Sequence, residues 1–257
     1  MALALGGSDA TVTGIGGGLL ARVSISYAEA KWRPTVKAYI GDETTLMSGG
    51  DVTIQAFNNH DEDGVLQSSN KARAEAIASG GGLASVPGSE ANVTIDASVE
   101  AKVGAGATVS SGDDLRIISK SRNFADADAV GVSIGAVASV GSNTARATLS
   151  NESLAGTTNG TGITDGTTLI AGGDITVSSD SDNRADVDTV SGSGGLVDDS
   201  GGKSIINMNR NLTQALIGDW SMIDAAGTLG LYANNKGDLH ARTSQDLSVS
   251  LVPIINV

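Results

Sequence analysis

Apolar and polar residues alternate with a period of two along most of this chain. The alternation is clearest after short turns of Gly, Asp or Thr, where an apolar-x-apolar triplet recurs four times, at 50–54, 113–117, 173–177 and 227–231. Turn-forming residues that lead into such a triplet predict a tight turn followed by a strand. Equivalent positions in the four copies (Asp51, Asp114, Asp174 and Thr228) are separated by 63, 60 and 54 residues. The chain is therefore predicted to repeat a unit of about 60 residues.

A second element follows each copy and consists of Ala alternating with charged residues. It occupies 70–76, 123–129 and 183–189, with a shorter copy at 240–243. Ala has the highest helix propensity, so an Ala-rich charged segment can indicate a helix. Strict alternation instead places every Ala on one face and every charge on the other, which is the pattern of a half-buried strand.

Two further elements complete the unit. One is a Gly-rich apolar stretch at 80–86, 131–140 and 192–197, with a related stretch at 14–20. The other is a strand at 35–41, 91–104 and 213–218, with a weaker copy at 145–149. Each unit is thus expected to hold several alternating strands joined by Gly, Asn, Asp and Ser turns.

Stacked strands of this kind predict an all-β fold, a parallel β-helix or β-solenoid, right-handed because parallel crossovers favour that hand. Short-period solenoids use roughly 20–30 residues for a coil, so each unit is expected to contain two or three coils and the chain about 9–12. We predict one continuous solenoid over residues 1–257, with units at 1–49, 50–111, 112–171, 172–226 and 227–257. The predicted core consists of inward-facing Ala, Val, Ile and Leu: Val52, Ile54, Ala72, Ala74, Ala76, Val93, Ile95, Leu115, Ile117, Ala125, Ala127, Ala129, Ile175, Val177, Leu229 and Leu231.

Composition supports a slender core. The 257 residues include 35 Gly, and only 3% are aromatic although 40% are hydrophobic. Small side chains fill a narrow space between closely spaced walls better than a wide globular core. The chain has no Cys, which excludes disulfides and thiolate metal sites. Its formal net charge of −13 argues against nucleic acid and anionic lipid as partners, and no stretch approaches the roughly 20 apolar residues of a membrane helix, so we expect no membrane insertion.

Loops of uneven length are expected to project from the coils, the longest at 58–69, 151–168 and 197–203. Both ends of the chain fall inside a unit, and the chain stops at 251–255, where another copy of the Gly-rich stretch is due. Neither end shows the polar cap that is typical of a solenoid terminus. We therefore expect the segment to belong to a longer array or to stack end-on with other copies.

The tandem motifs Gly-Asp-apolar-x-apolar, Asn-x-Ala-x-Ala and Gly-Gly-Leu-Ala-Ser-Val, seen together at 50–54, 70–76 and 81–86, resemble a known type of repeat. They are similar to the β-strand repeats of very large bacterial exoproteins, the filamentous-haemagglutinin-like and leukotoxin-like surface adhesins. The resemblance covers nearly the whole chain. It implies a right-handed β-helix stalk, secretion through an outer membrane, and a role in adhesion or in cell-surface fibres, and it implies no catalytic residue.

Candidate chemistry is sparse. The two histidines, His60 and His240, occupy unrelated positions of the unit, and surface positions are expected for both because a catalytic base needs an aligned partner. The acidic segments 61–63 and 198–199 offer carboxylates of the kind that bind Ca²⁺. The tandem Gly-Gly-x-Gly-x-Asp repeat of calcium-binding solenoids is absent, so solvated acidic turns are expected instead. We predict no catalytic, cofactor-binding or metal-binding residues, with Ca²⁺ as the one cofactor that the acidic segments leave open.

The main enzymatic alternative is a carbohydrate-active β-helix, in which acidic and basic side chains of adjacent coils line a groove. Asp126, Asp128, Asp186 and Asp188 point outward in equivalent strands. With several coils in each unit, the two pairs are expected to be separated by intervening coils. That separation exceeds the roughly 5–10 Å that paired carboxylates need for glycoside hydrolysis.

The sequence therefore favours a structural or adhesive stalk segment without catalysis, located outside the cell or on a bacterial cell surface. Its expected partners are neighbouring solenoid units or other copies end-on, together with host-surface or matrix glycans and proteins. Two alternatives stay open: a filament-forming subunit that assembles end-on, and a carbohydrate-binding or carbohydrate-active β-helix.

Overall fold

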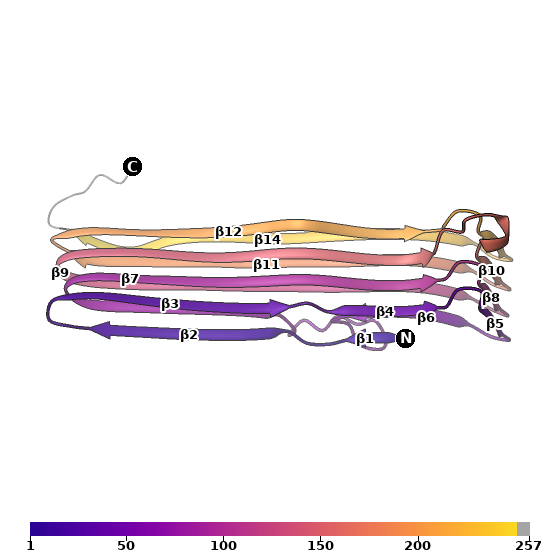
Figure 1. Cartoon of the computed structure of the whole chain (residues 1–257), viewed down its shortest axis with the longest axis horizontal. Helices are drawn as coiled ribbons and strands as arrows, with labels where there is room; N and C mark the ends of the chain where they lie inside the picture. Colours follow the sequence, from indigo (N-terminus) through magenta and orange to yellow (C-terminus); the bar gives the residue numbers. More distant parts are fainter. Residues whose placement is uncertain (251–257) are drawn as a thin grey trace.

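The chain folds into a flattened β-solenoid, in which long strands run back and forth and stack in parallel (Figure 1). The computed structural model describes residues 1–250, with the side chains of all but 163 and 245–250. The expected Gly-rich copy at 251–255 lies outside the described residues. The strands are β1 (Ala2–Ala4), β2 (Ser8–Gly17), β3 (Ala21–Trp32), β4 (Thr35–Ile40), β5 (Thr45–Ser48), β6 (Val52–Asn58), β7 (Ala72–Val103), β8 (Thr108–Ser111), β9 (Leu115–Thr157), β10 (Thr168–Ala171), β11 (Ile175–Gly195), β12 (Val197–Leu216), β13 (Met222–Ala225) and β14 (Leu229–Ser250), with one short 3₁₀ helix at Ile163–Asp165.

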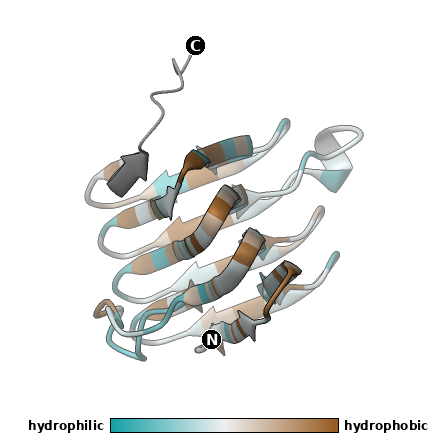
Figure 2. Cartoon of the chain, turned by 90° about the vertical axis from the view of Figure 1, so that its left-hand side faces the viewer, coloured by the Kyte–Doolittle hydropathy of each residue, from teal (hydrophilic) through white to brown (hydrophobic). Residues whose placement is uncertain are grey.

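One coil of the solenoid has two broad faces and one narrow face. We name the broad face that contains β11 the front face, although it lies behind β12 in the view of Figure 1. β12 returns along the other broad face, the back face, and β13 closes the end before β14 begins the next coil. In the coils below, β7 and β9 run through the bend and contribute to both broad faces. The narrow face is the parallel sheet of β5, β8, β10 and β13, which lies at one end of the elongated cross-section (Figure 1). The bends that join front to back lie at the other end, and Figure 2 looks directly at them.

The register shows that one sequence unit forms one coil. Leu115 pairs with Val52 in the coil below and with Ile175 in the coil above, and Ile175 pairs with Leu229. The parallel all-β solenoid is thus confirmed, but the expectation of two or three coils per unit, and of 9–12 coils in all, is wrong. β11 and β12 are 21 and 20 residues long, so a single circuit of the cross-section consumes a whole unit. Up to residue 250 the chain completes four coils and begins a fifth.

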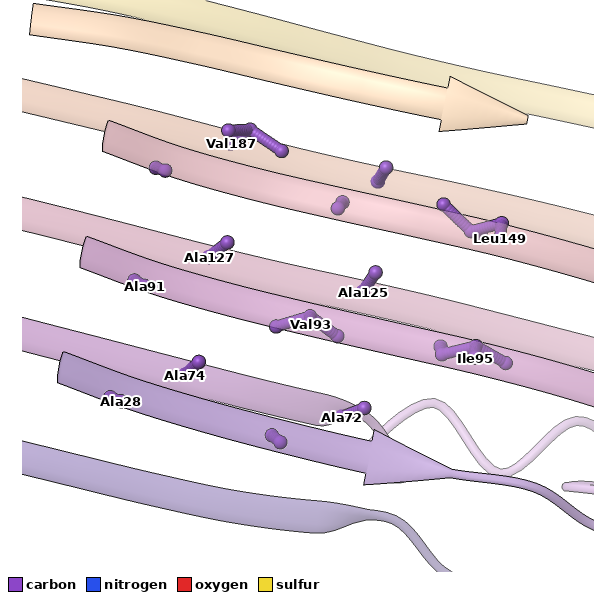
Figure 3. Packing of buried hydrophobic residues seen from close by; sticks show 14 of the residues in the cluster. Ala28, Ala72, Ala74, Ala91, Val93, Ile95, Ala125, Ala127, Leu149 and Val187 are labelled. Carbon is purple, nitrogen blue, oxygen red and sulfur yellow. The ribbon is translucent and has the colours of Figure 1, made fainter. Parts of the chain in front are cut away.

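Alternation buries a column of small side chains on each wall of the solenoid. Ala74, Ala127 and Val187 stack in register on the front face. They belong to the same buried cluster as Val93 and Ile95 of the back face (Figure 3). Small residues on one wall leave room for larger ones on the other, so the two sheets approach closely without many large side chains.

Most of the predicted core is buried, and the exceptions have a clear cause. Leu229 and Leu231 are 46% and 44% exposed, whereas every other predicted core residue is buried. Both lie in β14, the last front strand up to residue 250, and no further coil packs over them there. The predicted loop at 197–203 is also wrong, because these residues belong to β12. The other two predicted loops, 58–69 and 151–168, overlap the irregular segments 59–71 and 158–167, but residues 151–157 belong to β9.

A buried polar seam divides the interior into two apolar clusters. The first cluster contains the Ala-rich columns around Ala127, and the second contains Val and Ile columns around Ile117. The seam consists of Asn and Ser side chains that point inward between them: Asn58, Ser119, Ser121, Asn123, Asn151, Ser153, Ser179, Ser181 and Asn183.

Hydrogen bonds along the seam connect consecutive coils. The Asn123 side-chain amide donates to Oδ1 of Asn183 in the coil above at 3.0 Å and to Oδ1 of Asn151 on the opposite wall at 2.9 Å. The Asn58 amide of the coil below donates to Oδ1 of Asn123 at 3.2 Å. Buried amides are costly unless they are paired, and here the stacking of identical residues supplies the partners.

Replacement of Ala127 by Leu should destabilise the solenoid. Ala127 is fully buried between Ala74 and Val187, so three extra carbon atoms overfill the space between the sheets. We expect the free energy of unfolding to fall by about 1–3 kcal/mol, measured by urea denaturation. Ala136→Leu, at an exposed position of a bend, is the matched control and should leave the stability within about 0.5 kcal/mol of the parent.

Asn123→Ala should also destabilise the protein, through the partners that it leaves unpaired. Asn183 Oδ1 loses its donor, whereas the Asn58 amide and Asn151 Oδ1 each lose one of two hydrogen bonds and keep those with the Arg122 carbonyl and the Ser121 hydroxyl. An unsatisfied buried group costs about 1–3 kcal/mol. We expect a loss of at least about 2 kcal/mol in thermal or urea unfolding. The exposed Asn92→Ala is the control, and an equal loss in both variants would contradict a structural role for the seam.

Candidate functional site

The outward side chains of the front face form a charged ladder across four coils. Each strand there contributes two neighbouring outward positions, and the register stacks them into two columns. The first column holds Arg73, Asp126, Asp186 and His240, and the second holds Glu75, Asp128, Asp188 and Arg242. We use the name charged ladder for these eight residues.

The structure brings together carboxylates that the sequence was expected to keep apart. Asp126 pairs in register with Asp186, and Asp128 pairs with Asp188. Neighbouring strands lie about 4.8 Å apart, so the two pairs are direct neighbours with no coil between them. The expected separation is wrong because it assumed several coils in each unit.

Basic side chains are interleaved with these carboxylates. Arg73 Nη2 lies 3.1 Å from Glu75 Oε2 and 3.4 Å from Asp128 Oδ2, and Arg73 Nε lies 3.6 Å from Asp126 Oδ2. Lys71 also forms an ion pair with Asp126, and Arg184 Nη2 lies 2.8 Å from Asp186 Oδ2. Ion pairs as exposed as these contribute little stability individually, although the shared carboxylates make them a network.

The aromatic ring beside the ladder is surrounded by cations. The Arg184 guanidinium lies 4.7 Å from the centroid of the Phe124 ring, and Lys71 Nζ lies 5.5 Å from it. Both distances suit a cation–π interaction. Phe124 therefore helps to position the two basic residues that pair with Asp126 and Asp186.

Asp128 has the most distinctive electrostatic environment of the ladder. Partial burial raises the pKa of its carboxyl, the negative charge of Asp126 raises it further, and Arg73 opposes both effects. Asp126, Asp128, Asp186, Asp188 and His240 line a shallow depression of about 440 Å³ on this face. The arrangement offers one carboxyl that holds its proton more tightly than an ordinary aspartate does, in a hollow open to solvent.

The histidines take different positions. His240 is exposed, as expected, and its Nε2 lies 2.7 Å from Asp238 Oδ1. His60, expected at the surface, is only 9% exposed, because the irregular segment 59–71 folds back over the front face. Its Nδ1 donates to the Asn58 carbonyl at 2.9 Å, and burial lowers the pKa of the ring.

The acidic segments that were considered for Ca²⁺ binding do not form a binding site, and two of their carboxylates accept hydrogen bonds from nearby residues. Asp61 Oδ1 accepts hydrogen bonds from the backbone amides of Asp63 and Val65, which closes a local turn. Asp198 points inward and accepts a hydrogen bond from Ser193, whereas Asp199 points outward. Among the residues whose positions are described, no three His, Asp or Glu side chains converge as a metal site would require.

Sequence reasoning missed the basic half of the ladder and the polar seam. Arg73 and Arg184 lie in the same alternating segments as the predicted carboxylates, so their outward direction was visible in the pattern. Which residues of the neighbouring coils lie beside Arg73 and Arg184 depends on the register, and the alternating pattern alone does not give the register.

Within residues 1–250, no helix is long and apolar enough to cross a membrane. Comparisons with protein-family models, with curated proteins and with solved structures gave no match.

The Asp128 carboxyl should titrate above the usual range of Asp, and Asp126→Asn should lower its pKa by removing the adjacent charge. Because its folded-state pKa is raised, the folded protein binds this proton more tightly than the unfolded chain does. This carboxyl is therefore destabilising at neutral pH, and the penalty disappears as the pH falls through its folded-state pKa. NMR titration of the side-chain carboxyl ¹³C signals measures both effects. Asp96→Asn, on the back face, is the control and should leave the Asp128 titration unchanged.

Proposed function

We propose that this chain is a structural segment of an extracellular or cell-surface bacterial fibre, a stiff stalk that displays its faces rather than a catalyst. One observation carries the proposal. Equivalent residues keep the same register from coil to coil over most of each strand, with shifts only near Gly82, Ser191 and Met208 in the described residues, so the core columns continue through successive coils. A structure of this kind extends by adding units, as a stalk does.

Stiffness follows from the direction of the hydrogen bonds. In a parallel solenoid the backbone N–H and C=O groups point along the stacking axis, so each coil is bonded to the next along its strands, which make up most of its circumference. Long front and back strands increase the number of such bonds in each coil. The seam adds side-chain hydrogen bonds in the same direction.

Adhesion is the second part of the proposal. The broad faces present repeated outward columns, and the charged ladder is the most structured of them. The ladder offers titratable groups at the same two positions of each coil, which suits multivalent contact with host-surface or matrix glycans and proteins. The net charge of −13 keeps a protein with so much β-structure soluble.

Pulling on the two ends of a single molecule tests the stalk. We expect coils to unravel one at a time, so that each rupture releases about 180–230 Å of chain, the extended length of 54–63 residues. Asn123→Ala should lower the rupture force of the coils that it joins and leave the others unchanged. Extension in one step at low force, without a sawtooth, would contradict a stalk built from independent coils.

End-on assembly into a filament is the first alternative. Leu229 and Leu231 in β14, and Leu3 in β1, expose apolar side chains at the two ends of the stack. Parallel stacking makes the two ends different, so copies would join head to tail into an open fibre. Electron micrographs over a range of protein concentrations separate this alternative from a monomeric stalk, since only the filament lengthens with concentration.

A carbohydrate-binding or carbohydrate-active solenoid is the second alternative. The observation in its favour is the close pairing of Asp126 with Asp186 and of Asp128 with Asp188. A glycan array tests binding, and a reducing-sugar assay on the glycans that bind tests hydrolysis. Asp128→Asn should abolish any hydrolysis that uses Asp128 as an acid, and release that persists in this variant would exclude such a role.

A further inference from the structure

The bends that join the front and back faces carry a continuous apolar edge. The bends of successive coils lie one above another (Figure 2). In every complete coil up to residue 250, exposed apolar side chains lie at or beside the tip of the bend. They are between 42% and 91% exposed: Ile15, Leu19, Leu20, Val23, Ile25, Leu83, Val86, Val132, Ile134, Val137, Val140, Leu196 and Val197. We use the name apolar edge for these residues.

Polarity is inverted at this edge relative to the rest of the coil. In the long strands Ala and Val point inward and charges point outward. At the third bend Ser133 and Ser139 are fully buried, whereas Ile134 is 65% exposed. Because side chains alternate along a strand, a shift of one residue would have buried the apolar set instead. The register therefore presents these residues to the outside.

Tight packing inside the bend explains the small inner residues but not the apolar outer ones. A Cβ at Gly135 would lie 1.9 Å from the Ala138 carbonyl oxygen, and one at Gly195 would lie 2.6 Å from the Gly135 carbonyl oxygen. No larger residue fits at these inner positions. The outer positions face open space, where polar residues are the ordinary choice for a surface turn.

Charged residues are few at the bends: Arg22 follows the first tip, and Asp198 and Asp199 follow the fourth. The bends over 76–89 and 129–145 contain no charged residue, although the chain carries 29 acidic and 16 basic side chains. Two copies with a net charge of −13 each repel one another over most approaches. The two uncharged central bends are the part of the edge on which they can meet without opposing like charges.

The spacing of the edge also matches that of another copy. Val23 and Val86 stack in register. Leu19, Leu83, Val137 and Leu196 place one exposed apolar side chain at the tip of each bend, so an apolar side chain recurs at each coil, about every 4.8 Å. The fourth-coil partner of Val140 is Asp199, so the apolar column is confined to the tips there. A second solenoid presents the same step along its own axis, so contact at one coil brings the next coils into contact as well. We propose that the apolar edge is a lateral pairing surface, on which a second copy of this chain packs edge to edge.

The area indicates how strong such pairing is. Four coils make an edge roughly 20 Å long and roughly 20 Å wide, or about 400 Å² on each copy. Stable pairs bury about 800 Å² on each partner, so this segment alone pairs weakly. Each added coil extends the edge by about 100 Å², and pairing therefore strengthens with the number of coils. The inference goes beyond the proposed stalk, because a solitary solenoid can serve as a stalk without pairing.

Disulfide trapping tests the proposal, because the chain contains no native Cys. Leu83→Cys and Val137→Cys place single thiols on the edge in the second and third coils, and Met47→Cys on the narrow face is the control with equal or greater exposure. Under mild oxidation we expect the edge variants, alone or mixed, to form covalent dimers at least tenfold faster than Met47→Cys. Homodimers indicate parallel pairing and mixed dimers indicate antiparallel pairing, and either result supports the proposal.

A second substitution connects the trapping to the edge itself. Ile134→Asp in the Val137→Cys background should reduce dimer formation to the control rate, with an unchanged circular dichroism spectrum. End-on stacking cannot imitate the result, since it places equivalent residues of two copies about 20 Å apart, beyond the roughly 7 Å that a disulfide spans between Cα atoms. Equal rates for edge and control thiols would overturn the proposal. Flotation of the parent protein with phosphatidylcholine vesicles, without edge dimers, would overturn it in favour of a lipid surface.

Discussion

Each residue of this solenoid stacks on its equivalent in the next coil, and this parallel register governs the other features of the molecule. A parallel ladder spaces neighbouring strands by about 4.8 Å, so whatever a residue contributes at one coil is repeated at that interval. Ala74, Ala127 and Val187 become a core column, Asn123 and Asn183 become stacked amides, and Asp126 and Asp186 become adjacent charges. The stacking that repeats small residues in the core also places like charges next to each other on the surface. The interleaved Arg73 and Arg184 offset that cost.

The sequence predicts the fold because alternation is a local property. The segments 123–129 and 183–189 show which side chains face inward, and the buried Ala and Val columns agree. Coil size is not local, since a run of Ser and Asn such as 119–123 has the composition of a turn. In the structure these residues continue the strand and point into the polar seam. One circuit is therefore about two to three times longer than the expected coil.

The errors at the candidate site have the same origin. The alternating pattern shows that Asp126 and Asp186 point outward. Which residues lie beside them depends on the register between coils. His60 was misplaced because the segment 59–71 is an insertion between β6 and β7, and no repeat pattern shows that it covers Lys120, whose Nζ donates to the Gly64 carbonyl at 3.3 Å. Leu229 and Leu231 have the pattern of core residues but lie in the last front strand up to residue 250. The alternating pattern shows which face of a strand is apolar. Whether that face is buried depends on the presence of a neighbouring coil.

The asparagines of the seam have a consequence for how the coils find their alignment. Alanine columns are nearly degenerate, because sliding one strand by two residues places Ala125 beside Val187 instead of Ala185 and loses little contact. The same slide would place Asn123 beside Ala185 and leave its amide without the Asn183 carbonyl oxygen. A misaligned coil thus buries unpaired amides and is rejected, as a buried Asn sets the alignment of a coiled coil. The seam therefore favours the one alignment in which each newly folded coil pairs its buried amides with those of the coil before it.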